Sequence, residues 1–375
     1  FFSSKIAENI KNSEMIFMAV NTPTKTKGKG AGMASDLRYV EACSKDIAKY
    51  SINDKIVVEK STLPVRTAEK IKEILCTENN KVKFEILSNP EFLAEGSAIQ
   101  DLFKSDRVLI GGDATESGQK AVQSLVDIYL NWIPKNKIIT TNIWSSELSK
   151  LASNAMLAQR ISSINSLSAV CEKTGADTIE VSKAVGMDHR IGSYFLTPSP
   201  GFGGSCFQKD ILNLVYLCEY YGLKEVAEYW HQVVKINNYQ RDRIVEVVEK
   251  ATNYDPSKTI SILGWAFKKN TNDSRESSSI YISYKLLDKG YKIKIYDPKV
   301  KEERVFEDLR NLLNSKNDTR DLISKAEFCD SMINSINNSD VLLILTEWDE
   351  FREINSSKKI IDTRNLNIKN PYFKI

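Results

Sequence analysis

The sequence predicts an α/β protein with two parallel-sheet domains joined by an all-helical region that contains a long helix. Three observations point to this fold class. Short β-branched runs alternate with amphipathic segments in the first third, the strand pattern disappears in the middle, and it returns in the last third. At roughly 100–200 residues per domain, the 375 residues suggest two or three domains. We expect three, at residues 1–143, 144–253 and 254–375.

The first domain is predicted to hold buried strands, each a short apolar run, at 15–20, 55–59, 84–87, 107–110 and 137–140. Amphipathic helices are predicted between the first three strands, at 37–50 and 65–76. In the earlier helix, Leu37, Val40 and Ile47 recur at helical spacing. This alternation favours a parallel sheet with helices on its faces.

The middle of the chain is predicted to be helical at 145–173, 211–221 and 225–250, with a Gly- and Pro-rich loop at 197–204. In the first of these helices, Leu148, Leu151 and Ala155 recur at helical spacing. The last domain is predicted to contain a helix that ends at Gly290. Its expected strands are at 259–266, 292–296, 341–346 and 359–362.

Composition excludes several functional classes. The chain has 52 lysines and arginines against 49 aspartates and glutamates, and a net charge of +3 argues against a nucleic-acid or membrane surface. Its longest apolar runs are far shorter than the roughly 20 residues that a membrane span needs. Six cysteines without a C-x-x-C pair and only two histidines predict no metal site. We expect no signal peptide, reduced thiols and a cytoplasmic protein.

Polar motifs follow the predicted strands in both α/β domains. They are found at 21–24, 60–62, 88–91, 267–269 and 362–364. In open α/β sheets, ligands bind outside the carboxyl ends of the strands. The coincidence therefore predicts a ligand-binding cleft formed by these loops.

The segment around Cys206 has the most distinctive local chemistry. Three glycines, Gly201, Gly203 and Gly204, allow backbone N–H groups to approach a ligand closely. Cys206 is predicted at a helix N-terminus near Lys209, a setting that favours the thiolate, and Asp210 lies one turn further on. The pattern suits a nucleophilic thiol beside a carboxylate that activates water. The alternative is a helix-entry loop with a buried, inert cysteine.

Glu91 and Glu95 form an i, i+4 pair after Pro90, a residue that suits a helix start. We expect both carboxylates on one helical face at the sheet edge, where they could act in acid–base chemistry. The alternative is that they interact favourably with the helix dipole.

Lys150 and Asn154 form a second i, i+4 pair, on the first central helix. A cation beside an amide donor can stabilise a developing oxyanion. The alternative is a solvated helix face.

Taken in order, the motifs resemble those of the UDP-glucose/GDP-mannose dehydrogenase family, in particular its animal-type UDP-glucose 6-dehydrogenases. The motifs that carry the resemblance are Asn21-Thr22-Pro23-Thr24, Glu59-Lys60-Ser61-Thr62, 89–96, 145–150, 201–210 and Phe267-Lys268-Lys269. The resemblance implies two Rossmann-like domains bridged by a helical dimerisation region. It also implies oxidation of UDP-glucose to UDP-glucuronate with two NAD⁺, by a dimer that forms a hexamer.

The resemblance assigns the catalytic roles. Cys206 would attack the aldehyde formed by the first oxidation, and the resulting thiohemiacetal would be oxidised to a thioester that water hydrolyses. Lys150 and Asn154 would stabilise the oxyanions. Asp210 and Thr62 would position water, and Glu91 would assist proton transfer.

The resemblance also assigns binding residues. NAD would contact Val20, Asn21, Thr22, Thr24, Ser61, Thr62, Glu95 and Arg275. Arg190 would reach the substrate site of a neighbouring subunit. The other residues of the sugar-nucleotide site would be Glu91, Phe92, Leu93, Lys150, Asn154, Phe195, Leu196, Gly201, Phe202, Gly203, Phe267, Lys268 and Arg364.

One departure from the family pattern concerns the glycine fingerprint G-x-G-x-x-G, which does not occur after a strand near the N-terminus. Gly28, Gly30 and Gly32 lie among Lys25, Lys27 and Lys29 and open no helix, so we interpret this segment as an exposed loop. Relative to the family pattern, the first βαβ unit, which carries this fingerprint and a ribose-binding acid, is absent. We therefore expect weak or absent NAD binding and impaired folding of the chain as given. Two alternatives stay open: a dehydrogenase acting on GDP-mannose or a UDP-N-acetylhexosamine, and a catalytically inactive relative.

Overall fold

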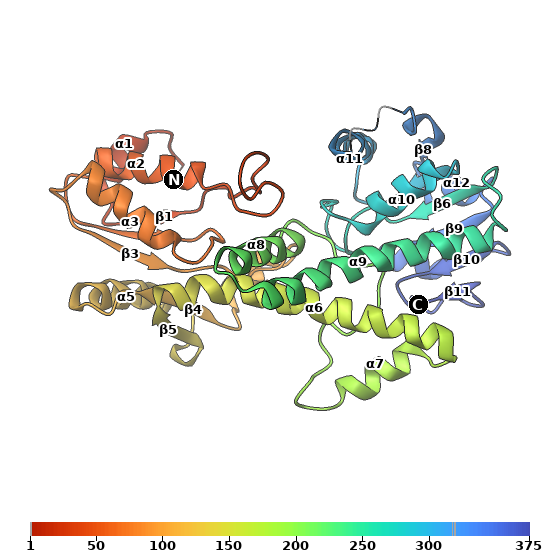
Figure 1. Cartoon of the computed structure of the whole chain (residues 1–375), viewed down its shortest axis with the longest axis horizontal. Helices are drawn as coiled ribbons and strands as arrows, with labels where there is room; N and C mark the ends of the chain where they lie inside the picture. The colour runs from red at the N-terminus through yellow and green to blue at the C-terminus, as the bar shows by residue number, and fades with distance from the viewer. Residues whose placement is uncertain (1, 317, 319) are drawn as a thin grey trace. The chain divides into compact units, whose positions relative to one another are not determined.

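The helices and strands of the computed structural model group into two units (Figure 1). Unit 1 comprises residues 1–155 and 209–227, and unit 2 comprises residues 156–208 and 228–375. The structure describes residues 2–316, 318 and 320–375. Three helices belong to both units along the chain: α6 (Ile143–Thr174), α8 (Phe207–Tyr220) and α9 (Lys224–Ala251).

The sheet of unit 1 follows the chain order β1-β2-β3-β4-β5. Its strands are β1 (Met15–Met18), β2 (Lys55–Glu59), β3 (Phe84–Ser88), β4 (Val108–Gly112) and β5 (Ile138–Asn142). All five lie at the predicted places. The pairs β1–β2, β2–β3 and β4–β5 are parallel, as predicted, whereas β3 and β4 meet at one antiparallel pair, Ser88 with Gly111. Only α4 (Ala98–Phe103), a six-residue helix, lies between β3 and β4.

Helices cover both faces of this sheet. Figure 1 shows α2 (Arg38–Tyr50) and α3 (Thr67–Glu78) on one side and α5 (Glu116–Tyr129) on the other. Successive strand residues therefore bury into different cores: Val57 packs in the α2–α3 core and Val58 in the α5 core. Burying such a side chain contributes about 1.5–3 kcal/mol. Because both faces of the sheet are covered, the centre of β2, residues 56–58, is a continuous apolar run. A short helix, α1 (Ile6–Asn12), packs against α2.

Unit 2 contains a parallel sheet in the order β11-β10-β9-β6-β7-β8. The strands are β6 (Thr259–Leu263), β7 (Lys292–Tyr296), β8 (Ala326–Phe328), β9 (Val341–Ile344), β10 (Lys359–Asp362) and β11 (Phe373–Lys374). Its remaining helices are α7 (Thr178–Gly186), α10 (Ser278–Asp288), α11 (Glu302–Ser315) and α12 (Met332–Ile336). Val248 of α9 and Leu286 of α10 share one core with Ile260 and Ile262 of β6.

One element prediction is wrong: no helix starts at Pro90. Residues 91–94 are irregular, and α4 begins only at Ala98. Side chains satisfy the backbone donors of this loop, because Leu93 N–H donates to Glu91 Oε2 at 2.6 Å and Ala94 N–H donates to Asp101 Oδ2 at 2.8 Å. Gly96 then turns the chain with a φ of 86°. Glu91 and Glu95 therefore do not share a helical face.

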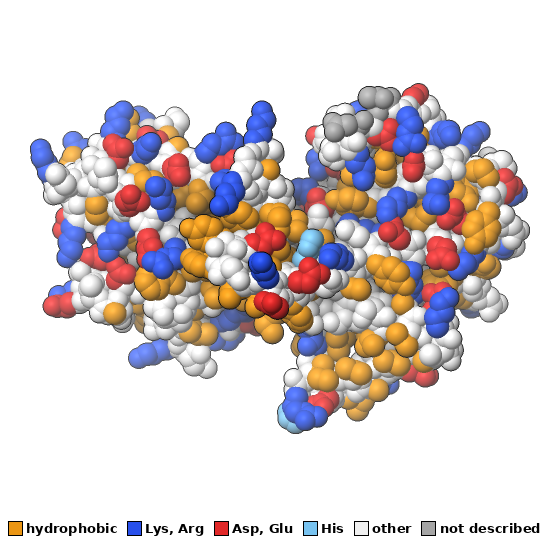
Figure 2. Space-filling model, viewed as in Figure 1, with side chains coloured by type: hydrophobic (Ala, Val, Ile, Leu, Met, Phe, Trp, Pro, Cys, Tyr) orange, Lys and Arg blue, Asp and Glu red, His pale blue; other side chains and the backbone are white. Residues whose placement is uncertain are grey.

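Charge is mixed on the face drawn in Figure 2, where Lys and Arg side chains alternate with Asp and Glu over both units. This distribution agrees with the small net charge of +3. Within the described part of the chain, no helix combines the length and the apolar character needed to cross a membrane.

Candidate active site

Lys150 lies on α6 and is buried, with only 4% of its surface exposed. Its Nζ is 3.3 Å from Glu91 Oε1, in the loop after β3, and 5.4 Å from the centre of the Phe92 ring. A lysine on a solvated helix face would extend into water instead. The alternative interpretation of this pair therefore fails for Lys150, and the structure brings two predicted catalytic residues, Lys150 and Glu91, into contact.

Asn154, one turn further along α6, donates from Nδ2 to Asp210 Oδ2 at 2.6 Å. Both side chains are buried, with 6% and 2% of their surfaces exposed. Burial raises the pKa of the Asp210 carboxyl, although Lys209 and the Asn154 hydrogen bond oppose the shift. A carboxyl group with a raised pKa is better suited to accept a proton near neutral pH.

The loops after β1 and β2 are joined by hydroxyl groups from the predicted NAD contacts. Ser61 Oγ donates to the Val20 carbonyl at 2.6 Å, and Thr22 Oγ1 donates to the Thr62 carbonyl at 3.2 Å. Lys209 of α8 donates to the Thr22 carbonyl at 3.3 Å. Asn21 is exposed beside these bonds, and Thr24 pairs with Ser35 in an isolated bridge. The polar loops thus lie together at the carboxyl ends of adjacent parallel strands, where ligands bind in such sheets.

Two further carboxyl groups, to which the motif analysis gave no role, are buried at the start of α3 and the end of β2. Glu147 of α6 accepts hydrogen bonds from the N–H groups of Arg66 and Ala68, at 2.7 and 2.8 Å, at the start of α3. Glu59, at the end of β2, faces Glu147, and both are buried. Burial, assisted by the Glu147 charge, raises the pKa of Glu59 well above its ordinary value. No sequence spacing links the two residues, because they come from separate elements.

In unit 2, the glycine-rich loop is held by α9. Phe202 N–H donates to Asn237 Oδ1 at 2.8 Å, and Asn237 Nδ2 donates to the Phe202 carbonyl at 3.1 Å. Arg241 Nη2 donates to the same carbonyl at 3.1 Å. Gly201 has a φ of 125°, and a Cβ there would lie 2.7 Å from Asn237 Oδ1. The loop can follow this path only because residue 201 lacks a side chain.

Cys206 stands directly before α8, at the helix N-terminus that the sequence predicts. It is partly exposed, and its Sγ is 3.4 Å from Ser205 Oγ. Cys171, Cys218 and Cys329 are buried. Cys206 is therefore not the buried cysteine of the alternative interpretation.

Several predicted substrate residues gather around this loop. Phe195 has a φ of 61°, and its ring centre is 6.4 Å from that of Phe207. Leu196 is buried, and a Cβ on Gly203 would lie 2.9 Å from Phe267 Cβ. Lys268 lies with its Nζ 5.6 Å from the Phe267 ring.

The three predicted arginines differ in their surroundings. Arg364 is largely enclosed: it pairs with Glu347 at 3.1 Å and donates to the Phe267 carbonyl at 3.0 Å. Arg190 and Arg275 have exposed side chains that pair with aspartates two residues earlier in the chain. Their substrate and NAD contacts stay predictions.

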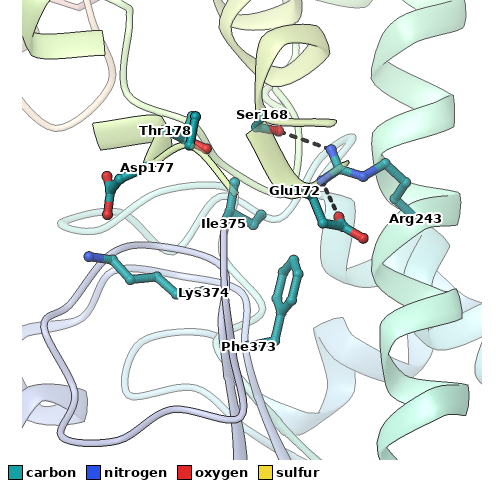
Figure 3. Close-up of a pocket in the computed structure, with 9 residues that line it drawn as sticks. Ser168, Glu172, Asp177, Thr178, Arg243, Phe373, Lys374 and Ile375 are labelled. Atoms are coloured by element: carbon teal, nitrogen blue, oxygen red, sulfur yellow. Dashed lines mark hydrogen bonds and ion pairs between the residues drawn. The ribbon is translucent and has the colours of Figure 1, made fainter. Parts of the chain in front are cut away.

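A small pocket in unit 2 contains none of the predicted site residues (Figure 3). It is lined by α6, α7, Arg243 of α9 and the end of the chain, and Arg243 pairs there with Glu172 at 2.7 Å. Over residues 2–316, 318 and 320–375, no group of three or more His, Cys, Asp or Glu side chains is arranged to hold a metal ion.

Comparison with protein families gives matches along most of the chain. Residues 1–133 match the NAD binding domain of the UDP-glucose/GDP-mannose dehydrogenase family, 144–239 its central domain, and 261–369 its UDP binding domain. The boundaries of 143 and 253 predicted from the sequence stay predictions.

Individual relatives agree. The chain is 51% identical over 381 residues to UDP-glucose 6-dehydrogenase 4 of Arabidopsis thaliana, covering 100% of the chain and 78% of the relative. It is 55% identical over 361 residues to UDP-glucose 6-dehydrogenase of Mus musculus, covering 94% and 72%. Among solved structures, a UDP-glucose dehydrogenase from the archaeon Pyrobaculum islandicum superposes with a TM-score of 0.87 at 30% identity, covering 100% of the chain and 82% of that structure.

Proposed function

Because the chain belongs to the UDP-glucose/GDP-mannose dehydrogenase family, and is thereby an NAD-dependent oxidoreductase, we propose that it oxidises UDP-glucose to UDP-glucuronate. The observation that carries the proposal is the buried cluster of unit 1. There Lys150 contacts Glu91 at 3.3 Å, and Asn154 bonds to Asp210 at 2.6 Å. Two charged or polar pairs from separate elements, largely removed from water, form an environment suited to stabilising charge during a reaction.

The loops after β1 and β2 fit the cofactor. Asn21, Thr22 and Ser61 supply polar groups at the carboxyl ends of two parallel strands, where nicotinamide dinucleotides bind in this class of fold. When bound, NAD⁺ accepts the hydride in each of the two oxidations. The weak binding expected from the missing glycine fingerprint stays a prediction.

Cys206 carries the covalent chemistry in this proposal. The first oxidation converts the C6 alcohol to an aldehyde. The Cys206 sulfur then adds to the aldehyde carbon, and its proton moves to the oxygen to give a thiohemiacetal. Loss of a hydride and a proton from this group leaves a thioester. Water cleaves the thioester to the carboxylate and restores the thiol, so the reactive aldehyde stays attached to the protein.

The unit 1 cluster serves these steps. The Lys150 ammonium and the Asn154 amide donate to the oxygen that becomes negative. Asp210, whose pKa is raised by burial, accepts a proton from water during thioester hydrolysis, and Thr62 positions that water. Glu91, beside Lys150, assists proton transfer from the alcohol.

Assembly and location complete the proposal. We infer a cytoplasmic homo-oligomer, built from dimers and reaching a hexamer, in which Arg190 serves a neighbouring subunit. The Arg190 side chain is exposed, as a residue directed to another subunit would be in a single chain.

The test is the number of NADH molecules formed per UDP-glucose consumed by the full-length gene product. We expect two, and we expect Cys206→Ser to abolish net NADH turnover. Cys76→Ser, on the exposed surface of α3, is the matched control and should keep activity. Undiminished turnover in Cys206→Ser would exclude the thioester mechanism.

The alternatives predict different results in the same assay. A panel with GDP-mannose and UDP-N-acetylhexosamines would identify a sister activity. Binding of UDP-glucose without NADH formation would indicate an inactive relative.

A further inference from the structure

Lys60 lies just beyond the end of β2, next to the cluster but outside the set of residues assigned above. Its Nζ donates to the Asn89 carbonyl at 2.9 Å, to Asn89 Oδ1 at 3.1 Å and to Tyr129 OH at 3.4 Å. Asn89 is fully buried and directly follows β3, and Tyr129 is the last residue of α5. One lysine therefore joins β2, β3 and α5.

The hydrogen-bond directions show which form of Lys60 the site accommodates. Tyr129 OH donates to Asn89 Oδ1 at 2.6 Å, and Asn89 Nδ2 donates to the Leu109 carbonyl at 2.8 Å. The three groups that face Lys60 are thus acceptors. An ammonium has three protons to donate, whereas a neutral amine has two and would present a lone pair to an acceptor. The directions of these hydrogen bonds match the charged form.

The contact continues into the catalytic cluster. Asn89 N–H still donates to the Glu59 carbonyl of β2 at 2.9 Å, whereas the Asn89 carbonyl accepts from the Lys60 side chain. Lys60 fixes that carbonyl. Two residues later, Glu91 pairs with Lys150 at 3.3 Å. Displacing Asn89 would move Glu91 relative to Lys150.

We propose that Lys60 is a positioning residue, whose ammonium holds Asn89 and thereby sets Glu91 against Lys150 for proton transfer. The expected effect on the reaction rate rests on the proposed function. The expected effect on the position of Glu91 rests on the hydrogen bonds alone.

The positioning depends on pH. Burial, the largest effect, and the Lys150 charge lower the pKa of Lys60 to about 8, while the Glu91 charge opposes them. The groups that face it are Glu91 from the loop after β3, Lys150 from α6 and Tyr129 from α5. Lys60 is charged below about pH 8 and loses its proton above it. Activity that depends on the ammonium should therefore fall as pH rises through that value.

The experiment compares Lys60→Met, Lys60→Arg and Lys55→Met by the pH dependence of kcat. Lys55 is the matched control, because it is a buried lysine at the other end of β2 whose Nζ also donates to a backbone carbonyl, Lys11 O, at 3.2 Å. Thermal unfolding of each variant establishes that it folds. A misplaced catalytic group can cost about 100-fold in rate.

We expect Lys60→Met to lose about 100-fold in kcat, with little change in KM, and Lys55→Met to lose less than about 3-fold. Lys60→Arg should recover most of the rate and extend the alkaline limit by at least one pH unit, because a guanidinium stays charged. A Lys60→Met variant within 2-fold of wild type would overturn the proposal. So would a Lys60→Arg variant with the wild-type pH profile.

A second measurement does not depend on catalytic activity. Competitive labelling with acetic anhydride, read by peptide mass, reports the protonation of Lys60 at each pH. Because the Glu91 charge favours protonated Lys60, Glu91→Gln should increase its labelling near pH 8. Unchanged labelling would overturn the link between the two residues even if UDP-glucose is not the substrate. Absence of NADH from the wild type with normal labelling results would instead exclude only the proposed function.

Discussion

The loop after β3 in unit 1 and the glycine-rich loop in unit 2 are held by different kinds of side chain. In unit 1, these side chains are ionisable: Lys60 fixes the loop after β3, and Glu147 binds the start of α3. In unit 2, the neutral amide of Asn237 hydrogen-bonds to both the N–H and the carbonyl of Phe202. Arg241 donates to the same Phe202 carbonyl. Amides do not titrate, and arginine stays charged at every accessible pH. The comparison indicates that these unit 1 contacts depend on protonation, whereas the contacts that hold Phe202 do not.

The largest expected effect on stability comes from removing the Asn237 amide, which holds the backbone of Phe202. Asn237→Ala leaves the buried N–H and carbonyl of Phe202 without that partner, so unfolding free energy should fall by about 2–4 kcal/mol. Urea titration measures the loss, which should be the same at pH 6 and pH 9. A loss that varies with pH would break the contrast between the units.

A smaller effect is expected where the same loop passes closest to α9. Gly201→Ala would place a methyl group 2.7 Å from Asn237 Oδ1 at a φ of 125°, and should cost about 2–3 kcal/mol. Gly222→Ala is the control: its φ is 73°, but nothing lies within 4 Å of the added carbon. Its backbone strain alone should cost about 1 kcal/mol. Equal losses in urea titration would show that packing against Asn237 is unimportant.

The smallest effect, of opposite sign, is expected in unit 1. The pKa of Glu59 is raised in the folded state, so its stabilising effect is complete below about pH 4.5 and is lost as pH rises through the folded value. Glu59→Gln keeps the shape of the protonated side chain without this loss. It should be neutral at pH 5 and stabilise by about 1 kcal/mol at pH 8 in urea titration. Destabilisation at pH 8 would show that the charged carboxylate is needed.

The sequence predicts the strands well and the partners of polar residues poorly. The positions of the five strands of unit 1 are confirmed, because short apolar runs are a local signal. The predicted burial holds for β1 to β4, which supply residues to the cores, but is wrong for β5, which has no buried residue. Cys206 is likewise found at the predicted start of α8, because a Gly-rich loop before an apolar-periodic segment is a local signal.

Burial of polar residues is decided by distant segments. Lys150 and Asn154 could equally belong to a solvated helix face until Glu91 and Asp210 are found beside them. Asn237 and Arg241 look like ordinary polar residues of a long helix, and no spacing reveals the loop they hold. The helix predicted at Pro90 fails for a similar reason, because Asp101 satisfies a donor that a helix would otherwise use.

The strand orders of the two sheets have a consequence for synthesis on the ribosome. In unit 1, every strand pairs with its neighbour in the chain, so the sheet can grow by one strand as each new segment emerges. In unit 2, β6 lies between β7 and β9, and its second partner is completed only at Ile344. One long edge of β6 must therefore wait while some eighty further residues are translated. During that interval, the apolar strand that precedes the Phe267 loop is open to incorrect pairing.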